Sequence, residues 1–147
     1  FAITRRWFAF NQELHCFYPC VCPDDPVRLL RGDKVRYPEE VHVHEAPRGL
    51  ELARHLSEPI DHHTVDSIDQ MFSKVNLYSS LAAKNLLVEE GRPPLWKVFV
   101  YPWLIWAQWY LMKGGWRDGL FGVIHGRYVR DTVYLKYLKA RMAAPTP

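Results

Sequence analysis

A stripe of apolar residues after Asp66 constrains the fold more than any other feature of this 147-residue chain. Apolar side chains recur there at steps of three and four residues, the spacing of one face of an α-helix. The stripe consists of Ile68, Met71, Phe72, Val75, Tyr78, Leu81, Ala82 and Leu86. Asp66 is a candidate N-cap, and Gly91 with Pro93 and Pro94 supplies a stop. The sequence therefore predicts a helix over residues 66–90 that buries one face.

The part of the chain before this helix has the composition of strands. Residues 1–10 (FAITRRWFAF) are rich in aromatic and β-branched residues, and Asn11-Gln12 follows as a turn. In residues 41–44 valines alternate with histidines, which predicts one arm of a hairpin over 23–45. Residues 50–56 fit a helical turn or a strand, with Pro59 closing the segment.

The expected fold class is therefore α+β. A short β-hairpin and mixed sheet should occupy residues 1–64, and three mainly amphipathic helices should occupy residues 65–147. The length suits one domain with a real core. The chain begins with Phe1, which suggests a fragment, a processed product or a start that lies upstream.

The charge balance limits the class of partner. The formal net charge is +3, which suits an anionic substrate or a membrane surface but is far below the basic footprint of a nucleic-acid-binding protein. The sequence also lacks the G-x-S-x-G, H-E-x-x-H and P-loop motifs of common hydrolases and NTPases. We therefore expect no nucleic-acid partner.

Three cysteines, Cys16, Cys20 and Cys22, are crowded into one loop. An odd number argues against a complete disulfide framework. Their spacing fits neither a common zinc ribbon nor a four-cysteine iron–sulfur motif, although His15 would complete a four-ligand set. Reduced, partly buried thiols are favoured over a metal site.

Residues 95–112 (LWKVFVYPWLIWAQWYLM) are unusually aromatic. The uncharged part covers about 15 residues, whereas a spanning helix needs roughly 20, and Pro102 should kink it. Trp103, Trp106 and Trp109 are residues that favour a bilayer interface. The pattern favours an in-plane or re-entrant membrane helix. A buried core helix is the alternative, and a true span packed against other membrane helices is a third.

A final helix is predicted over residues 120–142, after a hinge at Gly114-Gly115. It mixes aromatic and aliphatic residues with five cations: Arg127, Arg130, Lys136, Lys139 and Arg141. Such a basic amphipathic helix suits anionic lipid headgroups. A solvated surface helix fits the pattern equally well.

Three segments together resemble the second half of bacterial family-2 glycosyltransferases, in particular the lipopolysaccharide-core type that adds a single sugar. The first is PDDPVRLLR (23–31), followed by a short basic hairpin and Val43-His44-Glu45. The second, IDHHT (60–64), is similar to the family's L-x-H-Y-T segment, and the third, GWRDG (115–119), to its G-F-x-D-G. They occur in the same order and at similar spacing along nearly the whole chain. The resemblance implies the C-terminal part of a GT-A-like domain, with an acceptor-side segment over 1–64 and a helical, membrane-associating region over 65–147.

The resemblance also implies catalytic roles. Glu45 would be the general base, with Asp24 as a second candidate, and His44 would bind a metal or the leaving diphosphate. For each residue the alternative is a surface ion pair or a turn.

Substrate-binding roles follow in the same way. Arg28 and Arg31 would clamp phosphate through their forked donors, and His62 would hydrogen-bond an acceptor sugar. His63 replaces the aromatic residue that the family has after this histidine, which leaves the identity of the acceptor open.

The family's first half carries the nucleotide pocket and the Asp-x-Asp motif for a divalent metal (Mg or Mn). This chain has no Asp-x-Asp; Asp24 and Asp25 are adjacent. The expected enzyme uses a nucleotide-sugar and a glycolipid or polysaccharide acceptor at the cytoplasmic face of the bacterial inner membrane, and these 147 residues alone would be inactive. The alternative is a non-catalytic accessory subunit that docks on a membrane or a membrane-protein complex through its tryptophans and its basic C-terminal helix.

Overall fold

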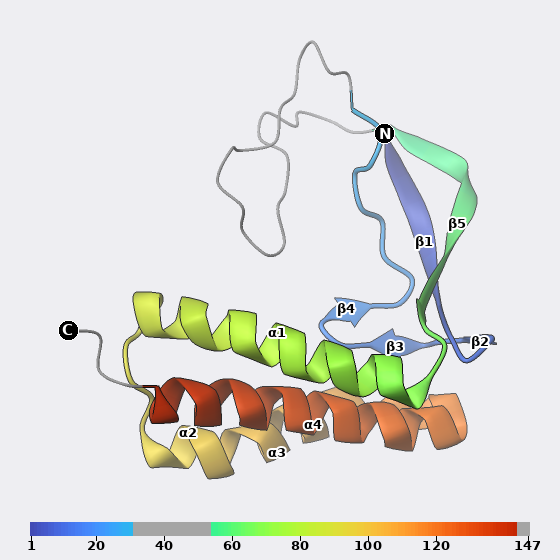
Figure 1. Cartoon of the computed structure of the whole chain (residues 1–147). Helices are drawn as coiled ribbons and strands as arrows, with labels where there is room; N and C mark the ends of the chain where they lie inside the picture. Colours follow the sequence, from blue (N-terminus) through green and yellow to red (C-terminus); the bar gives the residue numbers. More distant parts are fainter. Residues whose placement is uncertain (31–53, 144–147) are drawn as a thin grey trace.

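The α+β class is confirmed by the computed structural model, which describes residues 1–30 and 54–143 (Figure 1). The strands are β1 (Ala2–Ala9), β2 (Gln12–Glu13), β3 (Cys16–Phe17), β4 (Cys20–Val21) and β5 (His55–Val65). The α-helices are α1 (Ile68–Glu89), α2 (Leu95–Phe99), α3 (Tyr101–Ala107) and α4 (Gly119–Met142), with a π-helical turn η1 (Gln108–Met112) and a 3-10 turn η2 (Gly115–Asp118). The strands rise from one end of a layer of helices.

The larger sheet has the strand order β2-β1-β5. The predicted N-terminal strand is confirmed as β1, which pairs antiparallel with β2 and parallel with β5. The turn between β1 and β2 lies at Phe10 and Asn11, one residue earlier than expected, and both residues have positive φ angles of 48° and 59°. Such angles match the twist of a tight hairpin.

Strand β5 corrects the expectation that Pro59 closes the segment before it. The strand continues through Pro59 because β5 is a sheet edge among the described residues, and because the register shifts at this point. Ile3 pairs with Leu56 but Arg5 pairs with Ile60, so Pro59 falls in an irregularity where no ladder N–H is needed.

The predicted first helix is confirmed as α1, with Ser67 rather than Asp66 as its N-cap. Of the predicted apolar stripe, Met71, Val75 and Leu86 are buried, whereas Ile68, Phe72 and Tyr78 are exposed. The Ser67 hydroxyl accepts a hydrogen bond from the Gln70 N–H at 3.1 Å. In return, the Gln70 side-chain carbonyl accepts one from the Asp66 N–H at 2.8 Å. This reciprocal arrangement satisfies two backbone donors and closely resembles a capping box.

Replacing Ser67 by alanine should lower the free energy of unfolding by about 1 kcal/mol, because the Gln70 N–H loses its acceptor. Chemical denaturation followed by circular dichroism would measure the change. Ser67→Asp should retain most of the stability, since aspartate is an equally good N-cap. Equal stability of the alanine and wild-type chains would contradict the assignment of this cap.

The predicted last helix is confirmed as α4, and it buries one face among the other helices, while its docking on anionic headgroups stays a prediction. It packs against α1 on one side and α3 on another (Figure 1). Its buried residues are Phe121, Gly122, His125, Gly126, Tyr128, Val129, Thr132, Val133, Tyr137 and Ala140. The close approach of the turn η2 to α4 needs glycine: a Cβ on Gly122 would lie 2.0 Å from the backbone oxygen of Gly115.

Several of the cations on α4 bind within the fold. Lys139 donates hydrogen bonds to Ser79 and Ser80 of α1 at 2.8 Å, and Arg141 donates to the Pro93 carbonyl at 3.2 Å. Arg127 pairs with Asp131 at 2.7 Å. The contacts of Lys139 and Arg141 hold α4 to its neighbours, whereas the Arg127–Asp131 pair lies within the helix.

The aromatic segment is broken between α2 and α3, as the kink at Pro102 predicted. Its tryptophans differ in environment. Trp103 is 53% exposed, whereas Trp106 stacks on Tyr110 at 5.3 Å between ring centroids and Trp109 packs edge-on against Tyr18 at 5.3 Å. Within the described part of the chain, no helix combines the length and apolar character needed to cross a bilayer. An in-plane membrane association remains a prediction.

Strands and helices share one core. Its buried members are Trp7, Ala9, Leu14, Phe17, Val65, Met71, Val75, Phe121, Tyr128 and Val129. A second cluster lies between the helices and includes Ala83, Leu86, Val98, Val133, Tyr137 and Ala140. The shared core fixes the position of the sheet relative to α1 and α4, and the cavity described below lies between them.

Candidate functional site: a cationic cavity between sheet and helices

A cavity of about 610 Å³ lies between the sheet, the β3–β4 hairpin, α1 and α4. This volume is in the range typical of sites for small molecules. The lining combines aromatic rings, a few hydroxyl and amide groups, and several cations. The cavity is therefore the candidate functional site.

The sheet supplies one wall of the cavity. Arg5 and Trp7 lie on the same face of β1 because side chains alternate along a strand. The parallel register places His62 of β5 opposite Trp7, and their rings meet edge-on with centroids 4.6 Å apart. The Arg5 guanidinium lies over the Trp7 ring, 4.3 Å from its centroid.

Asp24 fixes this wall from behind. Its carboxylate forms an ion pair with Arg5 and accepts hydrogen bonds from Arg5 Nε at 2.9 Å and Trp7 Nε1 at 2.8 Å. Partial burial on its own would raise the pKa of Asp24, but the hydrogen bonds from Arg5 and Trp7 outweigh it, and the pKa lies below its ordinary value. A lowered pKa makes a weaker base. The geometry thus favours positioning of Arg5 and Trp7 by Asp24 over proton abstraction.

The helices supply the opposite wall. Lys74 and Tyr78 are one turn apart on α1, and Lys136 lies on α4. The Lys74 ammonium donates a hydrogen bond to the Thr64 carbonyl at the end of β5. Arg28, an exposed residue, also lines the cavity.

The pKa of His62 reflects the electrostatic environment of the cavity. Its pKa is lowered first by partial burial and then by the charges of Arg5 and Lys74, with a smaller contribution from Arg28; Asp24 acts in the opposite direction. The described lining residues include no aspartate or glutamate. The potential in the cavity is therefore positive, and the imidazole of His62 is neutral at pH 7.

The structure brings together three of the residues predicted from the sequence. Arg28 and His62 line the cavity, and Asp24 supports it from behind. Arg31, His44 and Glu45 lie outside the described residues, as does most of the expected hairpin over 23–45. Their assigned roles remain predictions.

Sequence reasoning missed Arg5, Trp7 and Lys74 as site residues. The alternation of Arg5 and Trp7 in a predicted strand could have shown that they share a face. Nothing local in the sequence indicates that Lys74 lies across a cavity from a strand some 70 residues earlier.

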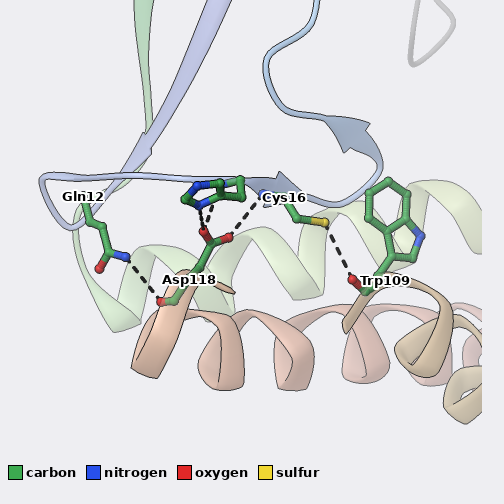
Figure 2. A network of polar contacts seen from close by, with 5 residues as sticks. Gln12, Cys16, Trp109 and Asp118 are labelled. Atoms are coloured by element: carbon green, nitrogen blue, oxygen red, sulfur yellow. Dashed lines mark hydrogen bonds and ion pairs between the residues drawn. The ribbon is translucent and has the colours of Figure 1, made fainter. Parts of the chain in front are cut away.

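Asp118 of the G-x-x-D-G segment forms a second polar network (Figure 2). Its carboxylate is 1% exposed and accepts hydrogen bonds from the His15 N–H at 2.8 Å and the Cys16 N–H at 3.2 Å. The His15 ring nitrogen Nδ1 lies 2.7 Å from the same carboxylate. Gln12 Nε2 donates to the Asp118 carbonyl oxygen at 3.3 Å. Asp118 therefore anchors the segment leading into β3 to the start of α4.

The loop of three cysteines has a structural role at Cys16. This free thiol is buried, and it lies 3.8 Å from the Trp109 carbonyl oxygen as a weak donor. Burial, reinforced by the charge of Asp118, raises the pKa of Cys16 to about 11, so the reactive thiolate is suppressed. Within residues 1–30 and 54–143, no group of three or more His, Cys, Asp or Glu side chains is placed to hold a metal.

Comparison with known proteins relates the chain to a glycosyltransferase. LpsC of Rhizobium meliloti (strain 1021), a lipopolysaccharide core biosynthesis glycosyltransferase, is 31% identical over 100 residues, which is 67% of this chain. The aligned part is 37% of the length of LpsC. No protein-family model and no solved structure matches the chain. The resemblance to glycosyltransferases is therefore supported at this general level.

Proposed function

We propose that this chain is the acceptor-side, C-terminal part of a family-2 glycosyltransferase of the GT-A type. The whole enzyme transfers a sugar from a nucleotide-sugar to a glycolipid or polysaccharide acceptor in lipopolysaccharide biosynthesis. The observation that carries the proposal is the cationic, aromatic-lined cavity into which His62 and Arg28 project. The similarity to LpsC over two thirds of the chain supports it.

Sugar transfer requires that both substrates are held in register, that a base receives the acceptor proton, and that negative charge is neutralised. The neutral imidazole of His62 suits a hydrogen bond with a sugar hydroxyl. Arg28 and Lys74 would neutralise negative charge. In this proposal Glu45 is the general base, while Asp24 keeps Arg5 and Trp7 in place.

Family-2 chemistry also implies Mg or Mn bound near the nucleotide. The described residues do not fit such a site, because none of their carboxylates and imidazoles gather in a group of three. In the proposal, His44 and the nucleotide half of the enzyme would supply the ligands of this metal ion.

The site of action in this proposal is the cytoplasmic face of the bacterial inner membrane. Apolar side chains are exposed along α2, α3 and η1, including Phe99, Trp103, Leu104 and Met112. The guanidinium of Arg130 lies 4.8 Å from the Trp103 ring centroid and adds a cation beside them. An apolar surface flanked by a cation suits an anionic membrane interface.

The same exposed surface favours one alternative function. A non-catalytic subunit derived from such an enzyme would use Trp103 and its neighbours to dock on a membrane-protein complex. The two functions differ in which residues the biological role requires.

The test is transfer of a labelled sugar by the protein as isolated from its native source, with mutations introduced in the gene. His62→Ala should reduce kcat/KM by about tenfold to a hundredfold, as expected for loss of a substrate-positioning contact. Lys84→Ala, on the exposed face of α1, should leave the rate unchanged.

The enzyme proposal fails if Glu45→Gln and His44→Ala preserve the biological role while Trp103→Ser abolishes it. That result would establish the docking alternative. The intact mass of the native polypeptide, compared with 17.3 kDa for this sequence, should be measured first so that the complete protein is assayed.

A further inference from the structure

We propose that the cavity binds a sugar that carries a phosphate group, and that this phosphorylated sugar is the acceptor. The phosphate would lie between Arg28 and Lys74, and the sugar would extend from beside His62 toward Tyr78 and Asn85 of α1. The inference rests on the proposed function, because it names the substrate class of the same site.

The first observation in support of the inference is the uncompensated positive charge of the cavity. Four cations line it, and one of them, Arg5, is paired with Asp24. Arg28 and Lys74 form no ion pair with any carboxylate of the described residues. Like charges that face one cavity without a counter-charge repel each other, and an anion between them relieves the repulsion.

The donors suit a phosphate in particular. Lys74 uses one ammonium hydrogen for the Thr64 carbonyl and keeps two for a ligand. Arg28 offers a planar fork of donors that matches two oxygens of a phosphate. The influence of Arg28 and Lys74 on the pKa of His62 shows that both charges reach the imidazole.

Lys136, the fourth cation, contributes less to this group. Its charge acts on Glu90, and its ammonium lies 5.2 Å from the Tyr137 ring centroid. The anion site is therefore at the end of the cavity formed by β5 and the first half of α1.

The rest of the cavity suits a sugar ring. Tyr78 and Tyr128 present aromatic surface, and Asn85, Thr64 and Thr132 present polar groups within the same lining. Binding sites for small polar molecules combine such apolar walls with a few placed hydrogen-bonding groups. The volume of about 610 Å³ leaves room for a sugar beside the phosphate.

Binding of glucose 6-phosphate to the complete protein tests the proposal, with glucose, inorganic phosphate and UDP-glucose as comparison ligands. By calorimetry we expect glucose 6-phosphate to bind at least tenfold more tightly than glucose or inorganic phosphate, and to weaken as salt is added. In an NMR titration, the pKa of His62 should rise when glucose 6-phosphate binds, because the anion offsets the neighbouring cations.

Arg28→Gln and Lys74→Gln should each weaken glucose 6-phosphate binding about tenfold. Lys84→Gln, on the same helix as Lys74 but outside the cavity, is the matched control and should change nothing. Lys74→Arg should restore part of the affinity. Circular dichroism identifies any variant that fails to fold, and Arg28→Gln alters an exposed side chain, so it keeps the test decisive.

The binding experiments would overturn the inference if glucose or inorganic phosphate bound as tightly as glucose 6-phosphate, or if the Lys84 control weakened binding as much as the variants of Arg28 and Lys74. UDP-glucose that competes more tightly, with the same dependence on Arg28 and Lys74, would show a donor site and overturn the acceptor assignment. A different result would contradict the proposed function: glucose 6-phosphate would bind as expected, but the complete protein would transfer no sugar. If transfer proceeds equally well to a dephosphorylated acceptor, the function stands and this inference falls.

Discussion

Replacing Asp118 by alanine should lower the free energy of unfolding by about 3 kcal/mol or more. The substitution removes the acceptor of the backbone N–H groups of His15 and Cys16, and a buried donor left without a partner costs roughly 1–3 kcal/mol. The contact with the His15 ring is lost as well. Urea denaturation at pH 7, followed by fluorescence, would measure the change.

Asp131→Ala is the matched control, because Asp131 is an aspartate on α4 whose carboxylate is also bound by other residues, but it is only partly buried. Its ion pairs with Arg127 and Arg130 are partly exposed, so we expect a loss below about 1 kcal/mol. Asp118→Asn should fall between the two, since the amide keeps one acceptor oxygen. Equal destabilisation by Asp118→Ala and Asp131→Ala would refute the anchoring role of Asp118.

The contacts of Asp118 also influence the cavity. Asp118 holds His15 and Cys16, and the next two residues, Phe17 and Tyr18, line the cavity. We therefore interpret the G-x-x-D-G segment as a positioning element, which holds the start of β3 and thereby the adjacent residues that line the cavity.

Elements with a local signal were predictable from the sequence. Helix α1 has apolar residues at helical spacing, β1 has strand-forming residues, and Pro102 marks a break. In each case the residues that determine the conformation lie within the element itself. The exact cap of α1 was not predictable, because Asp66 and Ser67 are adjacent and both are good N-caps.

The long-range arrangement was not predictable. Strand β5 has a polar, histidine-containing sequence with a proline, and its parallel partner β1 is about 55 residues away. The central position of α4 is also hidden, because its buried face includes Gly122, His125 and Thr132 rather than a continuous aliphatic stripe. Residues of this kind become buried only where a neighbouring element fits closely against them.

The candidate site shows the same limit. Arg28 and His62 were identified because they lie in segments that resemble a family. Arg5 and Lys74 became site residues only through the pairing of β1 with β5 and the packing of α1. Site residues that lie in one recognisable segment could be predicted from the sequence. Site residues that different elements bring together could be identified only from the fold.

His125 should make the stability of the protein depend strongly on pH in mildly acidic solution. The ring is buried and stacks on Phe17, Phe121 and Tyr128, with centroids 4.7, 5.7 and 5.5 Å away. Its Nε2 accepts a hydrogen bond from the Tyr18 N–H at 3.3 Å. Burial lowers the pKa of His125 to about 3, so the folded protein keeps the ring neutral.

The sign of the effect follows from the proton count. In the unfolded chain the ring takes up a proton below pH 6.5, and in the folded protein only near pH 3. Between these values the unfolded state binds one more proton, so the free energy of unfolding should fall by about 1.4 kcal/mol per pH unit, or roughly 4–5 kcal/mol in total. Denaturation curves at pH 7, 6, 5 and 4 would measure it.

His125→Gln, which keeps an acceptor for the Tyr18 N–H, should be less stable at pH 7 yet show a slope smaller by about 1.4 kcal/mol per pH unit. Other titrating groups contribute to both proteins, so the difference between the slopes isolates His125, and parallel curves would show that its ring is protonated in the folded state.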